Sequence, residues 1–399
     1  MPKSVTSNSF LPPKLNPLVT RLIQSIVPCI VYWGYQLELN ISDEDVNKVK
    51  AIASDRVIYL PNHSNLDDGL VIFGLSARLG QLFNYIVAYD AFRGLIGKLL
   101  QTVGAYSIRR GMGDRTSIMQ TLKILQQPAC KLVIFPEGGC SYQNDTVMPF
   151  RSGAIELSFK AIAELVKKNN TLPDFYLVPV SLKYRYTQEM DSAIASTLQR
   201  LETALQIQPE TQDCYLRTRT IAREIFNNLA TKYNFAIELT EDWNRAIEEL
   251  KIQLLNWCEQ KLNIEPNPQI AMRERVYKIQ AYLESENDKS SPVTLEIKTA
   301  ISKAAFTLLN FDAIYDGYVA ENPTAERFLD TLNRFEREVF QIDRPQPKGH
   351  RRACIVIGTP INLKDFWQSY QQNRESTIVT LTQQLQTTVR ENLTTDHSS

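Results

Sequence analysis

Residues 56–70, RVIYLPNHSNLDDGL, contain a strand, a turn and the start of a helix. The first five residues are rich in β-branched and aromatic side chains, as buried strands are. The polar turn that follows holds His63 and Asp68, and its Ser-Asn pair is typical of a helix start. Apolar residues at helical spacing then run from about residue 66 to 79. A strand followed directly by a helix is the repeating unit of a parallel α/β sheet.

The same alternation continues along the chain. Short β-rich runs begin at four further positions, Asn84, Ala105, Lys131 and Phe175. Helical patterns lie between them, at about residues 91–101, 116–127 and 152–168. Strands that alternate with helices predict an α/β fold with a mainly parallel sheet and helices on both faces.

The second half of the chain has a different pattern. From Thr187 to about residue 343 the periodicity is helical, without a convincing strand. The run ACIVIGTPINL, from Ala353, returns to strand character before two closing helices. We therefore expect four parts: an interfacial helical segment (1–45), an α/β core (46–186), an all-helical insertion before the last strand (187–350), and the closing strand and helices (351–399).

The formal net charge of zero is unevenly distributed along the chain. Residues 187–350 carry 19 Lys and Arg against 26 Asp and Glu, so the insertion is acidic and the rest of the chain is basic. Residues 91–131 hold seven cations and a single acid. Such a patch attracts phosphates, anionic lipid headgroups or acidic carrier proteins. It lacks interleaved aromatic residues, so we expect no nucleic-acid partner.

One long apolar segment, NPLVTRLIQSIVPCIVYWGYQL, starts at Asn16. Arg21, Gln24 and Pro28 interrupt it, whereas a membrane-spanning helix needs about 20 apolar residues. Its aromatic end suits the headgroup region, so this helix either lies in a membrane interface or packs on the domain. The six cysteines form no C-x-x-C pair, and nothing reads as a cleavable secretion signal. We expect a cytoplasmic protein that binds a membrane surface peripherally.

His63 follows the carboxyl end of the first predicted strand, where open α/β sheets hold their ligands. The first helical turn would bring Asp68 to the same side. A carboxylate on one imidazole nitrogen fixes the tautomer, so that the other nitrogen can take a proton from an alcohol. The spacing H-x4-D predicts a general-base pair, although by itself it is a weak signal.

Three further blocks accompany later strands: GAYSIRR (104–110), FPEGGCS (135–141) and VPVSL (178–182). Taken singly, each has an ordinary structural explanation. Arginine pairs form surface ion pairs, Glu-Gly-Gly forms turns, and a proline within a strand marks an edge or a bulge. Together, the histidine, the arginines and the glycines follow strands, so we expect them to converge on one edge of the sheet.

In this order and spacing, NHSNLDD, GAYSIRR, FPEGGCS and VPVSL resemble the four motifs of the glycerolipid acyltransferases related to bacterial 1-acylglycerol-3-phosphate acyltransferase. The resemblance covers about residues 50–186, and VIGTPINL resembles the family's closing strand. It implies a fatty acyl thioester of coenzyme A or acyl carrier protein as donor and a lipid hydroxyl as acceptor. It implies no cofactor and no metal.

The resemblance also assigns roles to residues. His63 is the base that deprotonates the acceptor hydroxyl, and Asp68 orients it, so that the alkoxide attacks the thioester directly. The implied acceptor-binding residues are Arg109, Arg110, Glu137, Gly138 and Gly139. The residues implied for the acyl pocket or for supporting the site are Asn62, Cys140, Ser141 and Pro179.

Two positions depart from the family's pattern. Cys140 replaces the arginine of Glu-Gly-Thr-Arg-Ser in the third motif, and Ser107 stands where the second motif carries Phe. Hydrogen bonds to a charged group are worth about 1.5–3 kcal/mol each. A neutral acceptor such as diacylglycerol, phytol or a quinol is therefore an alternative to glycerol phosphate or lysophosphatidate, unless Arg109, Arg110 or Arg115 compensates. A non-catalytic protein that binds lipids or acyl carriers, and an acyl-thiol route through Cys140, are further alternatives.

Overall fold

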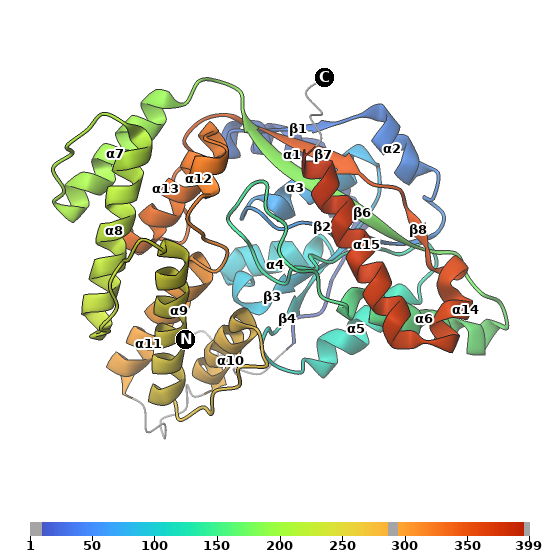
Figure 1. The fold of residues 1–399 in the computed structure, drawn as a ribbon. Coiled ribbons are helices and arrows are strands. Elements are labelled where there is room, and N and C mark those ends of the chain that lie inside the picture. The colour runs from blue at the N-terminus through green and yellow to red at the C-terminus, as the bar shows by residue number, and fades with distance from the viewer. Residues whose placement is uncertain (1–9, 286–293, 395–399) are drawn as a thin grey trace, which may run out of the picture. The chain divides into compact units, whose positions relative to one another are not determined.

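The computed structural model describes residues 10–285 and 294–394, so residues 1–9 of the expected N-terminal segment lie outside it. Two compact units make up the chain (Figure 1). The α/β unit comprises Phe10–Ile108, Asp114–Thr187 and the described residues from His350 onward. The helical unit comprises Arg109–Gly113 and the described residues of Gln188–Gly349. The N–H of Thr187 donates to the carbonyl of His350 at 3.0 Å, so the chain leaves and re-enters the α/β unit at one point.

The α/β unit is built on an eight-stranded sheet in the order β1-β7-β6-β2-β5-β3-β4, and β8 also pairs with β6. The strands are β1 (Leu37–Ile41), β2 (Arg56–Pro61), β3 (Asn84–Ala88), β4 (Ala105–Ile108), β5 (Lys131–Val133), β6 (Phe175–Tyr186), β7 (Arg351–Ile357) and β8 (Ile361–Asn362). From β6 to β4 all neighbours are parallel, whereas β7 and β8 are antiparallel to β6. The mainly parallel sheet predicted from the sequence is confirmed.

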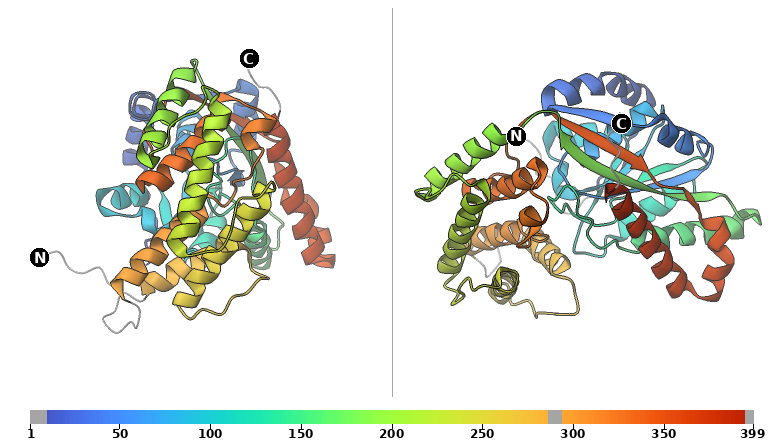
Figure 2. Two further views of the ribbon diagram at one scale, coloured as in Figure 1. Left: turned by 60° about the vertical axis from the view of Figure 1, so that its left-hand side comes forward. Right: turned by 45° about the horizontal axis from the view of Figure 1, so that its top comes forward.

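Helices cover both faces of this sheet (Figure 2). They are α1 (Pro17–Cys29), α2 (Asp43–Lys50), α3 (Asp68–Arg78), α4 (Gly94–Thr102), α5 (Arg115–Leu125), α6 (Gly153–Asn169), α14 (Trp367–Gln372) and α15 (Arg374–Thr394). Short helical turns add η1 (Ile30–Gly34), η2 (Tyr89–Ala91) and η3 (Leu363–Phe366). None of the helices in the described residues is both long and apolar enough to cross a membrane.

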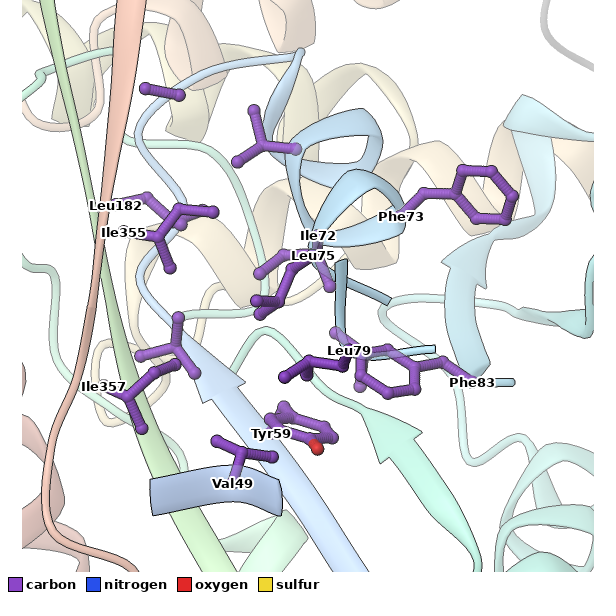
Figure 3. Packing of buried hydrophobic residues seen from close by; sticks show 14 of the residues in the cluster. Val49, Tyr59, Ile72, Phe73, Leu75, Leu79, Phe83, Leu182, Ile355 and Ile357 are labelled. Carbon is purple, nitrogen blue, oxygen red and sulfur yellow. The ribbon is translucent and has the colours of Figure 1, made fainter. Parts of the chain in front are cut away.

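Two apolar cores lie on opposite faces of the sheet. Because strand side chains alternate between faces, Tyr59 of β2 points into one core and Leu60 into the other. The first core contains residues of α1, α2 and α3, and the second contains residues of α5, α6 and α15. In Figure 3, Ile72 and Leu75 of α3 lie in the same cluster as Tyr59 and Ile355 of β7. The sheet is thereby buried on both sides, as parallel sheets require.

The helical unit follows β6 in the chain and precedes β7. Its helices are α7 (Asp191–Leu205), α8 (Cys214–Tyr233), α9 (Trp243–Lys261), α10 (Met272–Ser285), α11 (Leu295–Asn310), α12 (Tyr318–Glu321) and α13 (Ala325–Phe340). Side chains cap the N-termini of α8, α9, α11 and α13: Asp213, Asp242, Thr294 and Thr324. Part of the insertion's charge is internal, since Arg217 binds both carboxylate oxygens of Glu202 at 2.7 Å.

Two local expectations differ from the structure. Leu37–Ile41 falls within the segment expected to be helical, yet it forms β1, because it pairs in parallel with β7 from the far end of the chain. The helix expected from about residue 66 begins at Asp68. The side chain of Asn65 accepts a hydrogen bond from the N–H of Asp67 at 3.1 Å, which stabilises a turn before the helix instead of a cap.

Candidate active site

His63 and Asp68 form a hydrogen-bonded pair beyond the carboxyl end of β2. Nδ1 of His63 lies 2.9 Å from Oδ2 of Asp68, so the proximity predicted from their spacing is confirmed. With its Nδ1–H donated to the carboxylate, the imidazole keeps a lone pair on Nε2. The histidine side chain is 24% exposed and that of Asp68 is 0% exposed. The ring is thus accessible to a substrate, while its carboxylate partner is shielded from water.

The buried carboxylate of Asp68 accepts two further hydrogen bonds. The N–H of Asn65 donates to Oδ2 at 2.9 Å, and the hydroxyl of Tyr184 in β6 donates to Oδ1 at 2.5 Å. Burial of Tyr184, together with the nearby charge of Asp68, raises the pKa of this hydroxyl well above its usual value, so it remains a donor. These donors offset the loss of hydration of the carboxylate and hold it in one orientation toward His63.

Two asparagine side chains extend the sheet at this point. The pairing of β2 with β6 ends at Val180. Beyond it, the side chain of Asn62 accepts from the N–H of Leu182 at 2.7 Å and donates to its carbonyl at 3.0 Å. Asn144 makes the same two bonds with Tyr184, at 2.6 and 2.7 Å. The two side-chain amides thus take the place of a neighbouring strand. They hold Asn62 and the backbone of Tyr184 in register with each other.

The third motif is tied directly to His63. The buried carboxylate of Glu137 accepts from the N–H of His63 at 2.6 Å and from the N–H of Met148 at 3.0 Å. The N–H of Ser141 donates to the carbonyl of His63 at 2.7 Å. These bonds join the loops after β2 and β5, which are neighbours in the sheet. We expected Glu137 to contact the acceptor, but its engagement with backbone N–H groups favours a role in positioning the histidine.

Gly138 allows a positive charge to lie on the third motif. Its φ is +70°, and a Cβ on it would overlap the guanidinium of Arg151. The N–H of Arg151 donates to the carbonyl of Pro136 at 2.9 Å, which keeps this residue beside the loop. Gly139 is buried and Cys140 is half-buried. A guanidinium therefore lies on the loop in which Cys140 replaces the expected arginine.

This geometry places a proton acceptor, Nε2 of His63, next to a loop that carries a cation. Residues 40–183 match the family model described as Acyltransferase. This part of the chain is therefore an acyltransferase domain of the glycerolipid type. The protein is an acyltransferase, and the match spans the histidine turn and the third motif and ends within β6. Comparison with curated proteins found no significant match.

In the acyltransferase, Arg109 and Arg110 group with the helical unit and not with the unit that holds His63. The guanidinium of Arg110 donates to the hydroxyl of Tyr277 in α10 at 3.0 Å and lies 4.4 Å from the centre of its ring. Gly111, at φ +75°, packs so closely on the backbone of Tyr277 that a Cβ would overlap it. The insertion therefore holds the arginine-bearing loop, and the expected role of both arginines in acceptor binding remains a prediction.

Ser107 and Pro179 have structural roles in the acyltransferase. The Oγ of Ser107 accepts from the N–H of Leu11 at 2.9 Å, and its own N–H donates to the carbonyl of Leu11 at 3.0 Å. The serine thus binds the N-terminal segment where the family pattern carries Phe. On the side of Pro179 away from β2, β8 pairs with β6 up to Leu177 and β7 pairs from Val180. The missing N–H of the proline therefore faces a gap in the ladder.

Sequence reasoning missed Tyr184, Asn144 and Arg151. Strand alternation carries a signal for Tyr184, because counting in twos from Val180 places it on the face of the sheet covered by α3. Asn144 and Arg151 lie within the loop that follows the third motif. Nothing in their sequence context predicts that Asn144 binds β6 or that Arg151 packs on Gly138.

Proposed function

We propose that this acyltransferase transfers a fatty acyl group from an acyl thioester to a hydroxyl of a phosphate-bearing glycerolipid acceptor at a membrane surface. One observation carries the proposal: the buried carboxylate of Asp68, held by Tyr184 and Asn65, lies 2.9 Å from Nδ1 of a partly exposed His63. A neutral imidazole oriented in this way is a general base for an alcohol.

In the proposed step, Nε2 of His63 takes the proton of the acceptor hydroxyl while its oxygen attacks the thioester carbonyl. The new C–O bond forms a tetrahedral intermediate. The C–S bond then breaks, and the imidazolium returns its proton to the departing thiolate. Asp68 stays ionised throughout and stabilises the transient imidazolium charge. No acyl-enzyme intermediate forms, so Cys140→Ser should keep its activity.

Arg151 supports an anionic acceptor over a neutral one. Its guanidinium lies over Gly138, one residue beyond the Glu137 that binds the backbone of His63. A guanidinium fork matches phosphate oxygens in pairs. Arg151 can therefore supply the charge that the family pattern places at Cys140, which favours glycerol phosphate or lysophosphatidate over diacylglycerol, phytol or a quinol.

Helix α1 supports binding to a membrane surface, because two of its polar side chains, Thr20 and Gln24, are buried against the protein. The amide of Gln24 donates to Ser76 Oγ and to a backbone carbonyl, both at 2.9 Å. Several of its apolar side chains face outward, with Leu18 84% and Leu22 65% exposed, whereas Val27 packs into the core. Leu95 of α4 is 81% exposed. The two helices are joined where the hydroxyl of the buried Thr20 donates to the last carbonyl of α4 at 3.1 Å.

This outward apolar surface suits the acyl boundary of a bilayer. Exposed cations of α4 and its N-terminus, Lys98 and Arg93, would meet anionic headgroups and the phosphates of the donor. The cytoplasmic location and the choice between coenzyme A and acyl carrier protein remain predictions from the sequence.

Acyl transfer by the purified chain on liposomes tests the proposal. Labelled acyl-CoA and acyl carrier protein thioesters are each offered with glycerol 3-phosphate, lysophosphatidate, diacylglycerol and a long-chain alcohol, and products are identified by mass spectrometry. We expect a phosphorylated product that is lost in His63→Ala.

Arg151→Ala should raise the KM of the phosphorylated acceptor about 10- to 100-fold, equivalent to the loss of one charged hydrogen bond. Lys168→Ala, which removes an exposed cation at the other end of α6, should leave it unchanged.

Each other outcome identifies a different function. A neutral ester as the sole product, insensitive to Arg151→Ala, would replace the phosphorylated acceptor with a neutral one. Trapping of an acyl-cysteine together with an inactive Cys140→Ser would replace direct transfer with the thiol route. Acyl-chain binding without any product would favour the non-catalytic lipid-binding protein.

A further inference from the structure

The helical unit encloses an apolar cavity of its own. Side chains of α8, α9, α11 and α13 line it, among them Ile225, Leu250, Leu254, Leu308 and Phe335. Its volume is about 70 Å³, whereas one water molecule needs about 10–15 Å³. Apart from Lys251 and Thr307 the lining is apolar, so water finds few hydrogen-bond partners there. An apolar group fits this space better than solvent does.

The cavity opens next to cationic side chains. Four of its lining residues are half-buried, and we take these as its mouth: Ala222, Leu239, Ile247 and Ile314. Trp243 lines the cavity, and the guanidinium groups of Arg219 and Arg223 lie 4.0 and 5.8 Å from its ring centre. Arg219 is paired with Asp316 at 2.9 Å, and Arg223 is exposed. Because Arg223 lies over the ring of a lining residue and is exposed, its charge is available to an anionic head group there.

We propose that the helical unit binds one hydrocarbon chain of a fatty acid or anionic lipid, with the methyl end inside this cavity. The volume accommodates the terminal part of a chain, and the anionic head then lies at the mouth beside Arg223. The site consists of residues of the helical unit alone. It is therefore independent of the proposed function and does not require His63.

Quenching of Trp243 fluorescence by a brominated fatty acid tests this inference on the full-length chain. Below its micellar concentration, 12-bromododecanoate places its bromine at the methyl end. We expect saturable quenching that disappears in Trp243→Phe, with binding of the acid to that variant still detected by calorimetry. The His63→Ala variant should bind with unchanged affinity, which separates this site from the catalytic one.

Filling the cavity provides the second arm of the test. Leu254→Phe, which adds volume to the lining, should weaken binding at least tenfold. Leu198→Phe, an equal change at a buried site of α7 that does not line the cavity, should not weaken it. Arg223→Glu, on the surface, should weaken binding of the acid at least threefold and leave binding of 12-bromododecanol unchanged.

Three results would overturn the inference: no saturable quenching of the wild type, wild-type affinity in folded Leu254→Phe, or loss of binding in folded His63→Ala. Circular dichroism establishes folding for each variant. If Leu254→Phe does not fold, the test rests on Arg223→Glu. Equal affinities of Arg223→Glu and the wild type for the acid would then reject the site.

Discussion

At the residue scale, the chemistry of His63 depends on groups that are distant in sequence. The carboxylate that orients the ring is buried, and a buried charge is stable only when hydrogen bonds satisfy it. Tyr184 supplies one of these bonds from a strand more than a hundred residues later, and it is also the residue whose backbone Asn144 holds. The orientation of the His63 ring is therefore set by β6 as well as by its own turn.

Tyr184→Phe tests this dependence. Without the hydroxyl, Oδ1 of Asp68 loses a donor in a buried setting, so the free energy of unfolding should fall by about 1–3 kcal/mol. The carboxylate is also less constrained, and we expect kcat to fall about tenfold, roughly 1.4 kcal/mol of transition-state stabilisation, while KM changes little. Steady-state kinetics and denaturant unfolding measure the two effects.

Tyr106→Phe is the matched control for that variant. Its hydroxyl is also buried and hydrogen-bonds Thr121 at 2.7 Å, on the other face of the sheet. It should lose similar stability and keep wild-type kcat. Equal losses of kcat in Tyr184→Phe and Tyr106→Phe would show that Tyr184 acts only through stability.

At the element scale, polar side chains complete the edge of β6 and attach α1 to the rest of its unit. The inner edge of β6 is completed by the amides of Asn62 and Asn144 instead of by a strand. Helix α1 buries Thr20 and Gln24, so a segment that is too polar to span a membrane still exposes apolar side chains such as Leu18 and Leu22.

Asn144→Ala should weaken the carboxyl-terminal part of β6. It leaves the buried N–H and carbonyl of Tyr184 without their amide partner. Since each unsatisfied backbone group costs about 1–3 kcal/mol, the free energy of unfolding should fall by at least about 2 kcal/mol. Hydrogen exchange of the Tyr184 amide should accelerate. Asn47→Ala, an exposed site in α2, should change neither quantity, and protection of that amide equal to wild type in Asn144→Ala would contradict the assignment.

The outer face of α1 and α4 should govern liposome binding. Replacing Leu22 and Leu95 by Gln removes exposed apolar groups, so the partition coefficient onto anionic vesicles should fall at least tenfold. Thermal stability should be unchanged, because neither side chain is buried. Ile252→Gln, an exposed apolar site of α9, is the control and should bind as wild type does. Undiminished binding of the double variant would rule out this face as the membrane contact.

At the scale of the whole molecule, two units contain separate buried cores. One holds the His63–Asp68 pair and the sequence motifs apart from the two arginines, and the other holds the arginine-bearing loop and the apolar cavity. Separate cores predict separate unfolding transitions, since each unit loses its own buried surface when it opens.

Calorimetry on two variants tests the separate transitions. Leu75→Ala empties part of the core beside α3, and Leu332→Ala does the same in α13. Each should destabilise its own unit by about 2–5 kcal/mol and shift one transition only. A single transition that both variants lower together would show that the chain unfolds as one unit.

Much of the fold is encoded locally. Alternating and helical periodicity predicted the strands and helices from β2 to β6, the helical insertion and the return to strand near residue 353, because each pattern needs only near neighbours. The spacing also predicted the contact of His63 with Asp68, although the residues between them form a turn that precedes the helix. Local periodicity did not find β1, whose pairing with β7 joins opposite ends of the chain.

The sequence by itself thus determined the α/β class, the order of its elements and the histidine–aspartate pair, because these depend on short-range geometry and on motif order. Only the tertiary structure decided that Glu137 binds the backbone of His63, that Tyr184 satisfies Asp68, and that Arg151 lies on Gly138. These contacts join residues between 13 and more than a hundred positions apart. Their formation depends on which strands become neighbours in the sheet, and no local pattern specifies that.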